Sequence, residues 1–383
     1  MISWRSATVV SRGAAWTGAV ELAVRTDDGT ELRALAHPPM VGEPQVGDRV
    51  LLNVSAQVRG LGTGGYALVV ALPDALPADP PAGPGHLVKA RYTPLQAMVL
   101  GADEQESEHH ALLADADDLA GMPVVVADLH SALPAVVAGA RAAARDAGRP
   151  APRVAYVMTD GGALPAWFSR TVAGLRDAGW IDACVTVGQA FGGDLEAVTV
   201  HTGLLAARHV LDADLVVVAQ GPGNLGTGTR WGFSGVAAGE AVNAVAALGG
   251  RPVASLRVSG ADPRERHRGV SHHSLTAYGR VALAPADVVV PVLDPADATG
   301  DPEAAPSRAE LLARVHEQAA ALCAPAGRHS LVEVPAGARL LAALRESPVR
   351  LSTMGRGLDA DPEGFLAAAA AGVHAVDVLA APA

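Results

Sequence analysis

Residues 215–235, LVVVAQGPGNLGTGTRWGFSG, carry an apolar run that ends abruptly in a loop rich in glycine. The run has the composition of a strand that is buried on both faces of a sheet. Glycines leave the backbone N–H groups of the loop accessible, and the side chains between them can donate hydrogen bonds. A loop of this kind at the end of a buried strand is suited to binding an anion. The candidate ligand-binding residues of this loop are Gly221, Gly223, Asn224, Gly226, Thr227, Gly228, Thr229, Arg230 and Ser234.

The same change from an apolar strand to a polar loop recurs along the chain. Apolar runs alternate with Ala- and Leu-rich stretches of helical pattern, which is typical of a parallel sheet covered on both faces. Strands are expected at residues 87–92, 123–128, 153–158, 182–187, 215–220, 252–258, 287–293, 330–334 and 349–352. Helices are expected at residues 104–119, 132–147, 165–178, 203–211, 235–248, 307–323, 336–345 and 361–372. The pattern predicts a mainly parallel, doubly wound α/β domain over residues 87–383.

Residues 1–72 follow a different pattern of short β-branched or alternating stretches, with a strong hairpin signal at Asp28-Gly29. Strands are expected there at residues 6–11, 20–26, 30–36, 50–58 and 66–72. Strands this short and this closely spaced predict a small β-barrel-like domain of the OB or SH3 type. Residues 73–86, PDALPADPPAGPGH, have the composition of a linker between the two domains.

In a doubly wound sheet, ligands bind beyond the carboxyl ends of the strands. We therefore expect the loops 159–163, 188–196, 221–235 and 259–274 to meet at one edge of the sheet. Three carboxylates in these loops, Asp160, Asp194 and Glu196, are candidates for acid–base catalysis.

Residues 257–274 concentrate arginine and histidine and support three interpretations. In the first, the histidines and four arginines, Arg257, Arg264, Arg266 and Arg268, form a cationic pocket for phosphate or carboxylate groups, which guanidinium binds through paired hydrogen bonds. In the second, imidazoles and a carboxylate bind a divalent metal ion. In the third, the segment pairs with acidic residues of a neighbouring subunit. The metal ligands of the second interpretation would be His267, His272 and His273 with a carboxylate from Asp262, Asp160 or Asp194.

The three histidines are also candidates for proton transfer, because imidazole titrates near neutral pH. His272 and His273 are adjacent in the sequence. On an extended loop they would point to opposite sides, so we expect only one of them to face the pocket.

Two alternatives remain for the glycine loop. Gly221, Gly223 and Gly226 match the spacing of a dinucleotide fingerprint, but Pro222 occupies the tight turn and Glu240 comes too early for the ribose-binding acid. Dinucleotide binding is therefore not expected. The glycines could also serve only close backbone packing.

Composition narrows the function classes. A formal net charge of −11 argues against binding to nucleic acid or to an anionic membrane. Lys89 is the only lysine, which excludes a Walker A motif. Cys184 and Cys323 form no C-x-x-C pair, and Cys184 lies in an apolar run where burial is expected. With no signal-peptide pattern and no apolar run of about 18 residues without a charge, we expect a cytoplasmic protein.

Four segments carry a resemblance to a known family. VMTDGGALP, GQAFGGDLEAV, GPGNLGTGTRWGFSG and RHRGVSHHSLTA resemble the signature segments of an uncharacterised bacterial family, catalogued as a domain of unknown function, and the resemblance covers nearly the whole chain. It implies no activity, but it points to the same four loops.

The sequence therefore predicts an α/β enzyme, a hydrolase or a transferase, that binds a small anionic molecule bearing a phosphate or a nucleotide. A homodimer or a higher homo-oligomer is expected, and a divalent metal cofactor is an open alternative. The competing function is that of a non-catalytic ligand-binding or oligomeric interaction protein. A catalyst should have a histidine or carboxylate of strongly shifted pKa beside the pocket, whereas a binding protein needs only binding groups.

Overall fold

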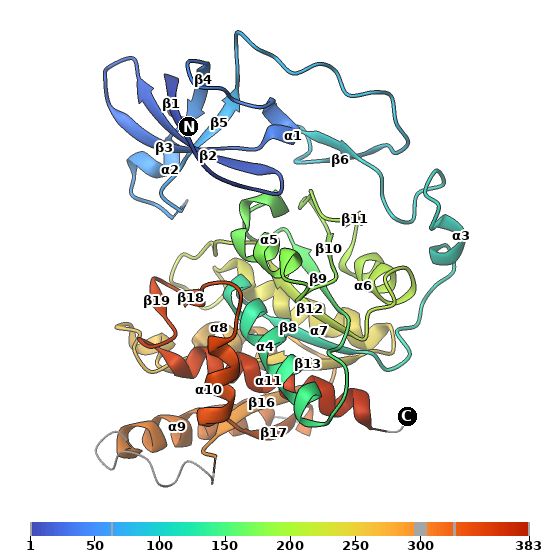
Figure 1. Ribbon diagram of the computed structural model, residues 1–383. Coiled ribbons are helices and arrows are strands. Elements are labelled where there is room, and N and C mark those ends of the chain that lie inside the picture. The colour runs from blue at the N-terminus through green and yellow to red at the C-terminus, as the bar shows by residue number, and fades with distance from the viewer. Residues whose placement is uncertain (1, 63, 295–304, 325–326, 382–383) are drawn as a thin grey trace. The chain divides into compact units, whose positions relative to one another are not determined.

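The computed structural model describes residues 2–62, 64–294, 305–324 and 327–381 (Figure 1). The chain divides into two compact units, each with its own sheet and core. One unit comprises Met1–Leu100 with Trp167–Ala173, and the other comprises Gly101–Ala166 with Gly174–Ala383.

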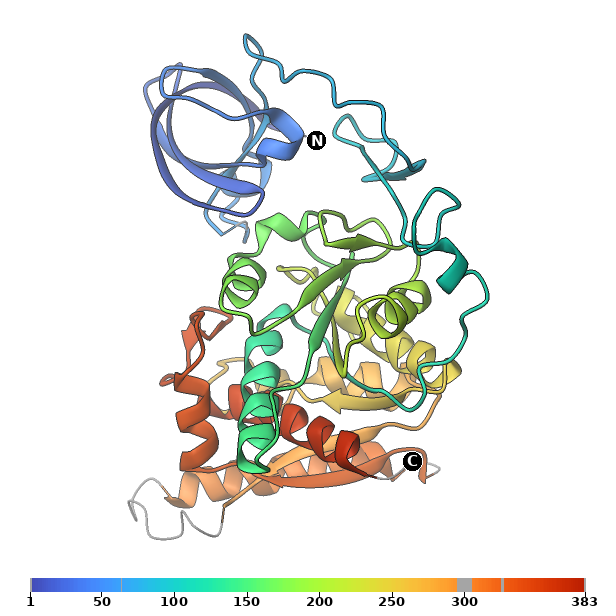
Figure 2. The ribbon, with the colours of Figure 1, turned by 45° about the vertical axis from the view of Figure 1, so that its right-hand side comes forward.

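The sheet of the first unit is a closed five-stranded barrel, as the sequence predicts (Figure 2). Its strands follow the order β1-β2-β3-β5-β4, and an apolar core that includes Val24, Val50 and Leu52 fills the interior. The strand expected at 50–58 is shorter, because Ser55–Val58 forms a helical turn (α2). The elements are β1 Trp4–Trp16, β2 Ala19–Thr26, β3 Glu31–Ala36, α1 Pro38–Val41, β4 Arg49–Asn53 and β5 Ala67–Ala71.

The second unit contains an eight-stranded sheet in the order β11-β10-β9-β12-β8-β13-β16-β17. Each neighbouring pair is parallel, which confirms the predicted topology. The central strands are buried along their whole length, because apolar side chains on both faces meet helices. The strands are β8 Pro123–Ala127, β9 Val154–Thr159, β10 Ala183–Thr186, β11 Leu195–Glu196, β12 Leu215–Gln220, β13 Arg251–Ser255, β16 Asp287–Val292 and β17 Ser330–Pro335.

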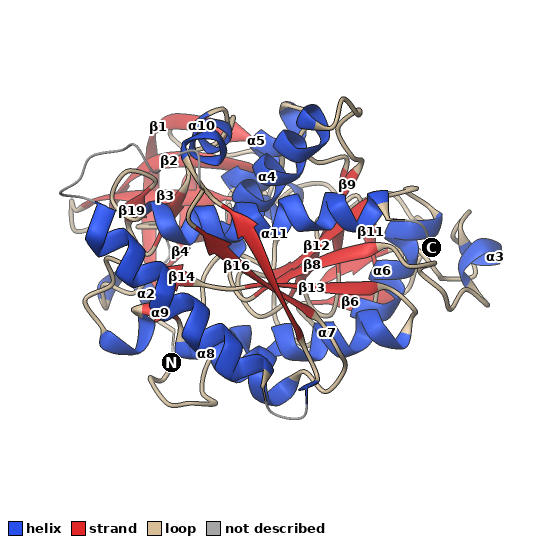
Figure 3. Ribbon diagram, turned by 90° about the horizontal axis from the view of Figure 1, so that it is seen from below, coloured by secondary structure: helices blue, strands red, loops and turns tan. Residues whose placement is uncertain are grey.

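Helices cover both faces of this sheet, as expected for a doubly wound fold (Figure 3). One layer holds α4 Leu133–Asp146, α10 Ala338–Arg345 and α11 Pro362–Ala380. The other holds α6 Val200–His209, α7 Ala237–Ala247 and α9 Ala305–Cys323. Helix α5, Arg170–Asp177, follows β9.

Helices α4 and α11 pack closely because glycines lie at their contact. A Cβ on Gly139 would come 2.0 Å from the carbonyl oxygen of Ala369, and one on Gly372 would come 2.0 Å from that of Val136. Helix α11 is long and apolar enough to cross a membrane by length and composition, but 67% of its most apolar window is buried inside the protein.

Three further predicted elements differ from the structure. The strand expected at 87–92 is β6 Leu87–Lys89, which pairs only with β7 Ala97–Val99, since positive φ angles at Ala90 and Tyr92 turn the chain away. The strand expected at 349–352 is replaced by a small hairpin of β18 Ser352–Thr353 and β19 Arg356–Gly357. The helix expected at 104–119 shrinks to α3 His110–Leu113. Its second half carries several aspartates, and Asp118 accepts a hydrogen bond from the Ala120 N–H in a turn.

Candidate functional site

The site lies where the strand order reverses. From β8 the chain passes to β9, two places away in the sheet, and continues to β10 and β11 at the edge. It then returns to β12, which lies between β9 and β8. From β12 the chain crosses to β13, on the other side of β8. The loops after β12, β8 and β13 therefore lie together at the carboxyl edge of the sheet, the usual ligand position in this class of fold. These loops contain the glycine loop, Asp128 and residues 257–274.

Asn224 organises the base of the glycine loop. Its Oδ1 accepts hydrogen bonds from Gln220 Nε2 (3.0 Å), Ser234 Oγ (3.1 Å) and the Gly235 N–H (3.3 Å). Gly221 packs against the loop after β9, where a Cβ would come 2.4 Å from the Ala163 carbonyl oxygen. Asn224, Ser234 and Gly221 thus shape the loop.

The tip of the loop is exposed and closed by its own hydrogen bonds. The Thr227 N–H donates to the Gly232 carbonyl (2.7 Å), and the Gly232 N–H donates to Thr229 Oγ1 (3.1 Å). Gly223 and Gly228 have positive φ angles of 91° and 80°, which glycine adopts without strain. Gly226 pairs with Phe233 across the loop, so the chain returns toward the sheet, with Arg230 in the exposed turn.

Asp262 is held by arginines. Its oxygens accept from Arg264 Nε and Nη2, both at 2.9 Å, and from Arg356 Nη2 at 3.2 Å. These hydrogen bonds, with those of Arg264 first in importance, lower the pKa of Asp262 well below its ordinary value. The carboxylate therefore stabilises the segment after β14 (Val258–Ser259), and the histidines remain as the candidate metal ligands.

A pocket of about 760 Å³ is lined by residues from both the glycine loop and the segment 257–274. Arg230 comes from the loop, Arg266 from the 3-10 turn η4 (Glu265–His267), and Arg280 from the π-helix η5 (Ala277–Val281). No carboxylate is among the described residues that line it, which are Arg230, Arg266, His272, Leu275, Thr276, Gly279, Arg280, Gln318, Ala321 and Leu322.

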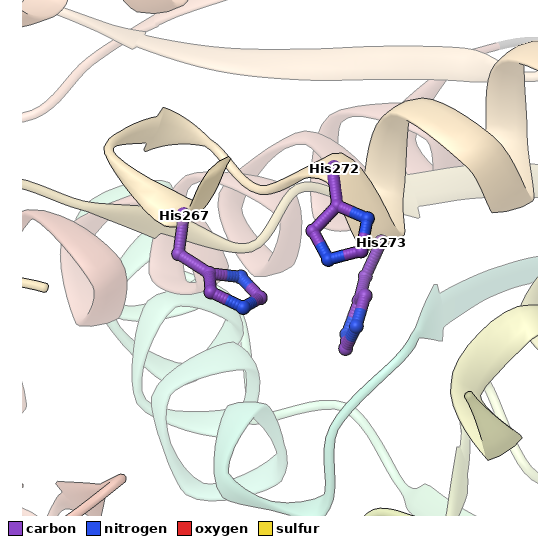
Figure 4. Close-up of side chains that lie close together, drawn as sticks. All are labelled: His267, His272 and His273. Atoms are coloured by element: carbon purple, nitrogen blue, oxygen red, sulfur yellow. The ribbon is translucent and has the colours of Figure 1, made fainter. Parts of the chain in front are cut away.

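His267, His272 and His273 form a cluster in which one ring nitrogen from each lies within 4.8 Å of the others (Figure 4). His272 and His273 begin helix α8 (His272–Thr276), whose N-cap is Ser271. Because this segment is helical and not extended, the two adjacent rings do not point to opposite sides, and their centroids are 4.4 Å apart. His272 lines the pocket, whereas His273 is buried and stacks on Phe233 at 3.9 Å.

All three imidazoles are held in the neutral form. Burial is the main cause, and nearby arginines add to it, lowering the pKa of His267 to about 4 and that of His273 to about 3. The pKa of His272 is lowered by burial and by Arg266. Neutral imidazoles can accept a proton or bind a metal, but they are poor proton donors at neutral pH.

Asp128 is a site residue that the strand pattern missed, because it directly follows the apolar run of β8. It is 2% exposed, and its Oδ2 has no hydrogen-bond partner among the described residues. Burial raises its pKa to about 6, although Arg257 opposes the shift. Its Oδ2 lies 3.8 Å from Nδ1 of His273, which Arg257 Nη1 also approaches at 3.2 Å. An acidic residue that ends a buried strand was the available signal.

Helices α8 and η5 are anchored to the sheet by Tyr278. Its hydroxyl lies 2.7 Å from the Val126 carbonyl of β8 and 3.3 Å from the Ser255 carbonyl of β13. A π-helical segment is uncommon and occurs frequently at functional sites. It places Arg280 in the same wall as His272.

The three predicted catalytic carboxylates lie elsewhere along the edge. Asp160 accepts from the Gln189 N–H (2.8 Å), Glu196 accepts from Thr186 Oγ1 (2.6 Å), and Asp194 accepts from the Cys184 N–H (2.7 Å) and pairs with Arg176. Glu196 is on β11, five strands from β13, which corresponds to roughly 24 Å at about 4.8 Å per strand. The structure does not bring these carboxylates to the histidines.

Among the predicted arginines, Arg266 reaches the pocket, while Arg257 approaches His273 beside it. Arg268 is exposed and is not among the lining residues.

The family described as "Protein of unknown function (DUF3866)" matches residues 33–372, and the chain belongs to it. No curated protein and no solved structure matches the chain.

Proposed function

We propose that this member of the family binds a small anionic molecule, bearing a phosphate or a nucleotide, in the pocket lined by Arg230, Arg266 and Arg280, and acts on it as a hydrolase or a transferase. The observation that carries the proposal is that three arginines from three separate segments line one pocket, and that no carboxylate is among the described residues lining it. Because the whole chain has a net charge of −11, this local excess of positive charge sets the pocket apart from the rest of the protein.

The groups in the pocket suit an anion. Guanidinium forms paired, charge-assisted hydrogen bonds with phosphate oxygens, and Arg230 brings one such group from the glycine loop to the pocket. His272, neutral and in the same wall, could take a proton from an attacking water or hydroxyl group.

The second candidate is a binding protein without catalysis. It is favoured by one observation, namely that Asp160, Asp194 and Glu196 are hydrogen-bonded to the loop after β10 or to β10 itself and are not among the residues that line the pocket. In that case the arginines would bind the anion without turnover. A cytoplasmic homo-oligomer remains an expectation under both functions.

Binding is tested by calorimetry with inorganic phosphate, pyrophosphate and a nucleoside triphosphate. Arg266→Ala should weaken binding about tenfold or more, because a hydrogen bond to a charged group contributes about 1.5–3 kcal/mol. Arg268→Ala is the matched control. It also removes one positive charge, only two residues along the chain, but Arg268 does not line the pocket. Both variants should keep the melting temperature, because exposed substitutions change stability by about 0.5 kcal/mol or less.

Equal binding by the two variants, or no binding of any of the three anions to the unchanged protein, would contradict the proposal. If an anion binds, turnover is measured as the release of inorganic phosphate from that anion. Binding without turnover favours the second candidate.

A further inference from the structure

We infer that His267, His272 and His273 form a binding site for a divalent transition-metal ion, with Zn²⁺ as the ion that the ligand set fits best. The inference goes beyond anion binding and stands on the histidines themselves. Only the role of the metal toward a bound anion rests on the proposed function.

The geometry is close to that of a three-histidine zinc site. Nitrogen ligands at about 2.0–2.1 Å in a tetrahedral arrangement are about 3.3 Å apart. The imidazole nitrogens of the cluster lie within 4.8 Å of one another, and the ring centroids are 4.4, 4.9 and 5.1 Å apart. To reach that spacing the nitrogens must approach one another by up to about 1.5 Å, and Figure 4 shows the three rings facing a common space.

A second observation points to a ligand. Nε2 of His272 is buried and has no hydrogen-bond partner among the described residues. A buried polar atom without a partner is uncommon and needs an explanation. A metal ion between the three rings would satisfy it.

The surrounding groups can orient the ligands. Nδ1 of His267 is 2.8 Å from Ser271 Oγ, so a proton on Nδ1 leaves Nε2 available for the metal. Asp128 Oδ2 lies 3.8 Å from Nδ1 of His273, and Arg257 Nη1 lies 3.2 Å from the same atom. The buried carboxylate also supplies negative charge that offsets the repulsion between the arginines and a cation.

Zinc is favoured over the hard cations by the donor set. Ca²⁺ and Mg²⁺ prefer oxygen ligands, and the carboxylate of Asp262 is paired with two arginines. Three imidazoles are typical of zinc sites that keep a fourth position open for water or substrate. Because His272 also lines the anion pocket, an oxygen of a bound phosphate could take that fourth position.

The test uses the full chain, stripped with a chelator and titrated with Zn²⁺ and with Co²⁺. We expect one metal ion per chain and Co²⁺ absorption bands of the intensity that four-coordinate sites show. His272→Ala should weaken Zn²⁺ binding by more than about 100-fold. The loss of a group that only orients a metal ligand already costs up to about 100-fold, and this variant loses a ligand itself. His201→Ala, the same change at an exposed histidine, should bind as the unchanged protein does.

A second variant keeps the test valid if His272→Ala does not fold. His272→Asn keeps a polar side chain of similar reach, and circular dichroism shows whether each variant is folded. Folded variants that bind Zn²⁺ as tightly as the unchanged protein would overturn the inference, as would an unchanged protein that binds no stoichiometric Zn²⁺ or Co²⁺.

The two proposals can fail separately. Phosphate binding that depends on Arg266 in a chain that binds no Zn²⁺ would overturn the metal site alone. Stoichiometric Zn²⁺ binding in a chain whose phosphate affinity ignores Arg266 would overturn the anion pocket alone.

Discussion

Buried ionisable side chains are concentrated just beyond the ends of β8 and β13. Asp128 and His130 follow β8 directly, and the histidine cluster follows β13. Burial favours the neutral form of each side chain. It raises the pKa of Asp128 to about 6 and lowers the pKa of His130 to about 4. Shifted groups beside a crevice are typical of functional sites, although structural networks shift pKa values as well.

His130 makes the stability of the fold depend on pH. Its Nδ1 lies 2.9 Å from the hydroxyl of buried Tyr156, and burial lowers its pKa from 6.5 to about 4. The unfolded chain therefore binds more protons than the folded chain between those pH values. We expect the free energy of unfolding to fall as the pH drops through this window, by up to about 3 kcal/mol from this residue.

Urea denaturation at several pH values checks the effect. In His130→Asn the loss of stability between about pH 7 and pH 5 should be smaller than in the unchanged protein. His201→Asn, at an exposed position, should keep the full loss. The same pH dependence in all three chains would contradict the role of His130.

At the scale of elements, the close contact of α4 with α11 positions the helical layer behind β8. Gly139 and Gly372 let the two backbones approach, where a side chain on either helix would meet a carbonyl oxygen. Glycine is unfavourable inside a helix, so its use here indicates that close packing outweighs helix propensity.

Gly139→Ala tests that balance. Alanine gains about 1 kcal/mol in helix propensity, but its Cβ would come 2.0 Å from the Ala369 carbonyl oxygen and force the helices apart. Overpacking of this kind outweighs the gain, and we expect a net loss of about 1–3 kcal/mol in the free energy of unfolding. Thermal denaturation measures it. Gly62→Ala, where a Cβ meets no atom within 4 Å, should leave stability nearly unchanged, and equal effects at both glycines would argue against the contact.

At the scale of the whole molecule, the barrel and the α/β unit have separate hydrophobic cores. Leu52 belongs to the barrel core, whereas the anion pocket and the histidine cluster are built from the α/β unit alone. The proposed chemistry should therefore tolerate damage to the barrel.

Leu52→Ala tests whether the site in the α/β unit depends on the barrel. Leu52 is 0% exposed, and removing its side chain should cost about 2–5 kcal/mol of barrel stability. Hydrogen exchange should then rise in peptides from residues 4–71, while phosphate affinity at a temperature well below unfolding stays as in the unchanged protein. A parallel loss of phosphate affinity would show that the barrel supports the site.

The sequence by itself determined the two kinds of sheet and the loops that carry the polar groups. Period-two stretches in a short N-terminal region and continuous apolar runs farther on are local signals, because burial on one or both faces of a strand dictates them. The same signals misjudged short segments such as 87–92 and 104–119, where turns decide the backbone.

Only the tertiary structure decided which polar loops share a site. All of them end at the same edge, but strand order is set by crossover connections that leave no mark in the local sequence. That order placed Glu196 five strands from β13 and brought Asp128 beside His273, while the helical turn at Ser271 turned His272 and His273 toward one another. Which side chains can act together depends on distances across the sheet, and the folded chain alone fixes those.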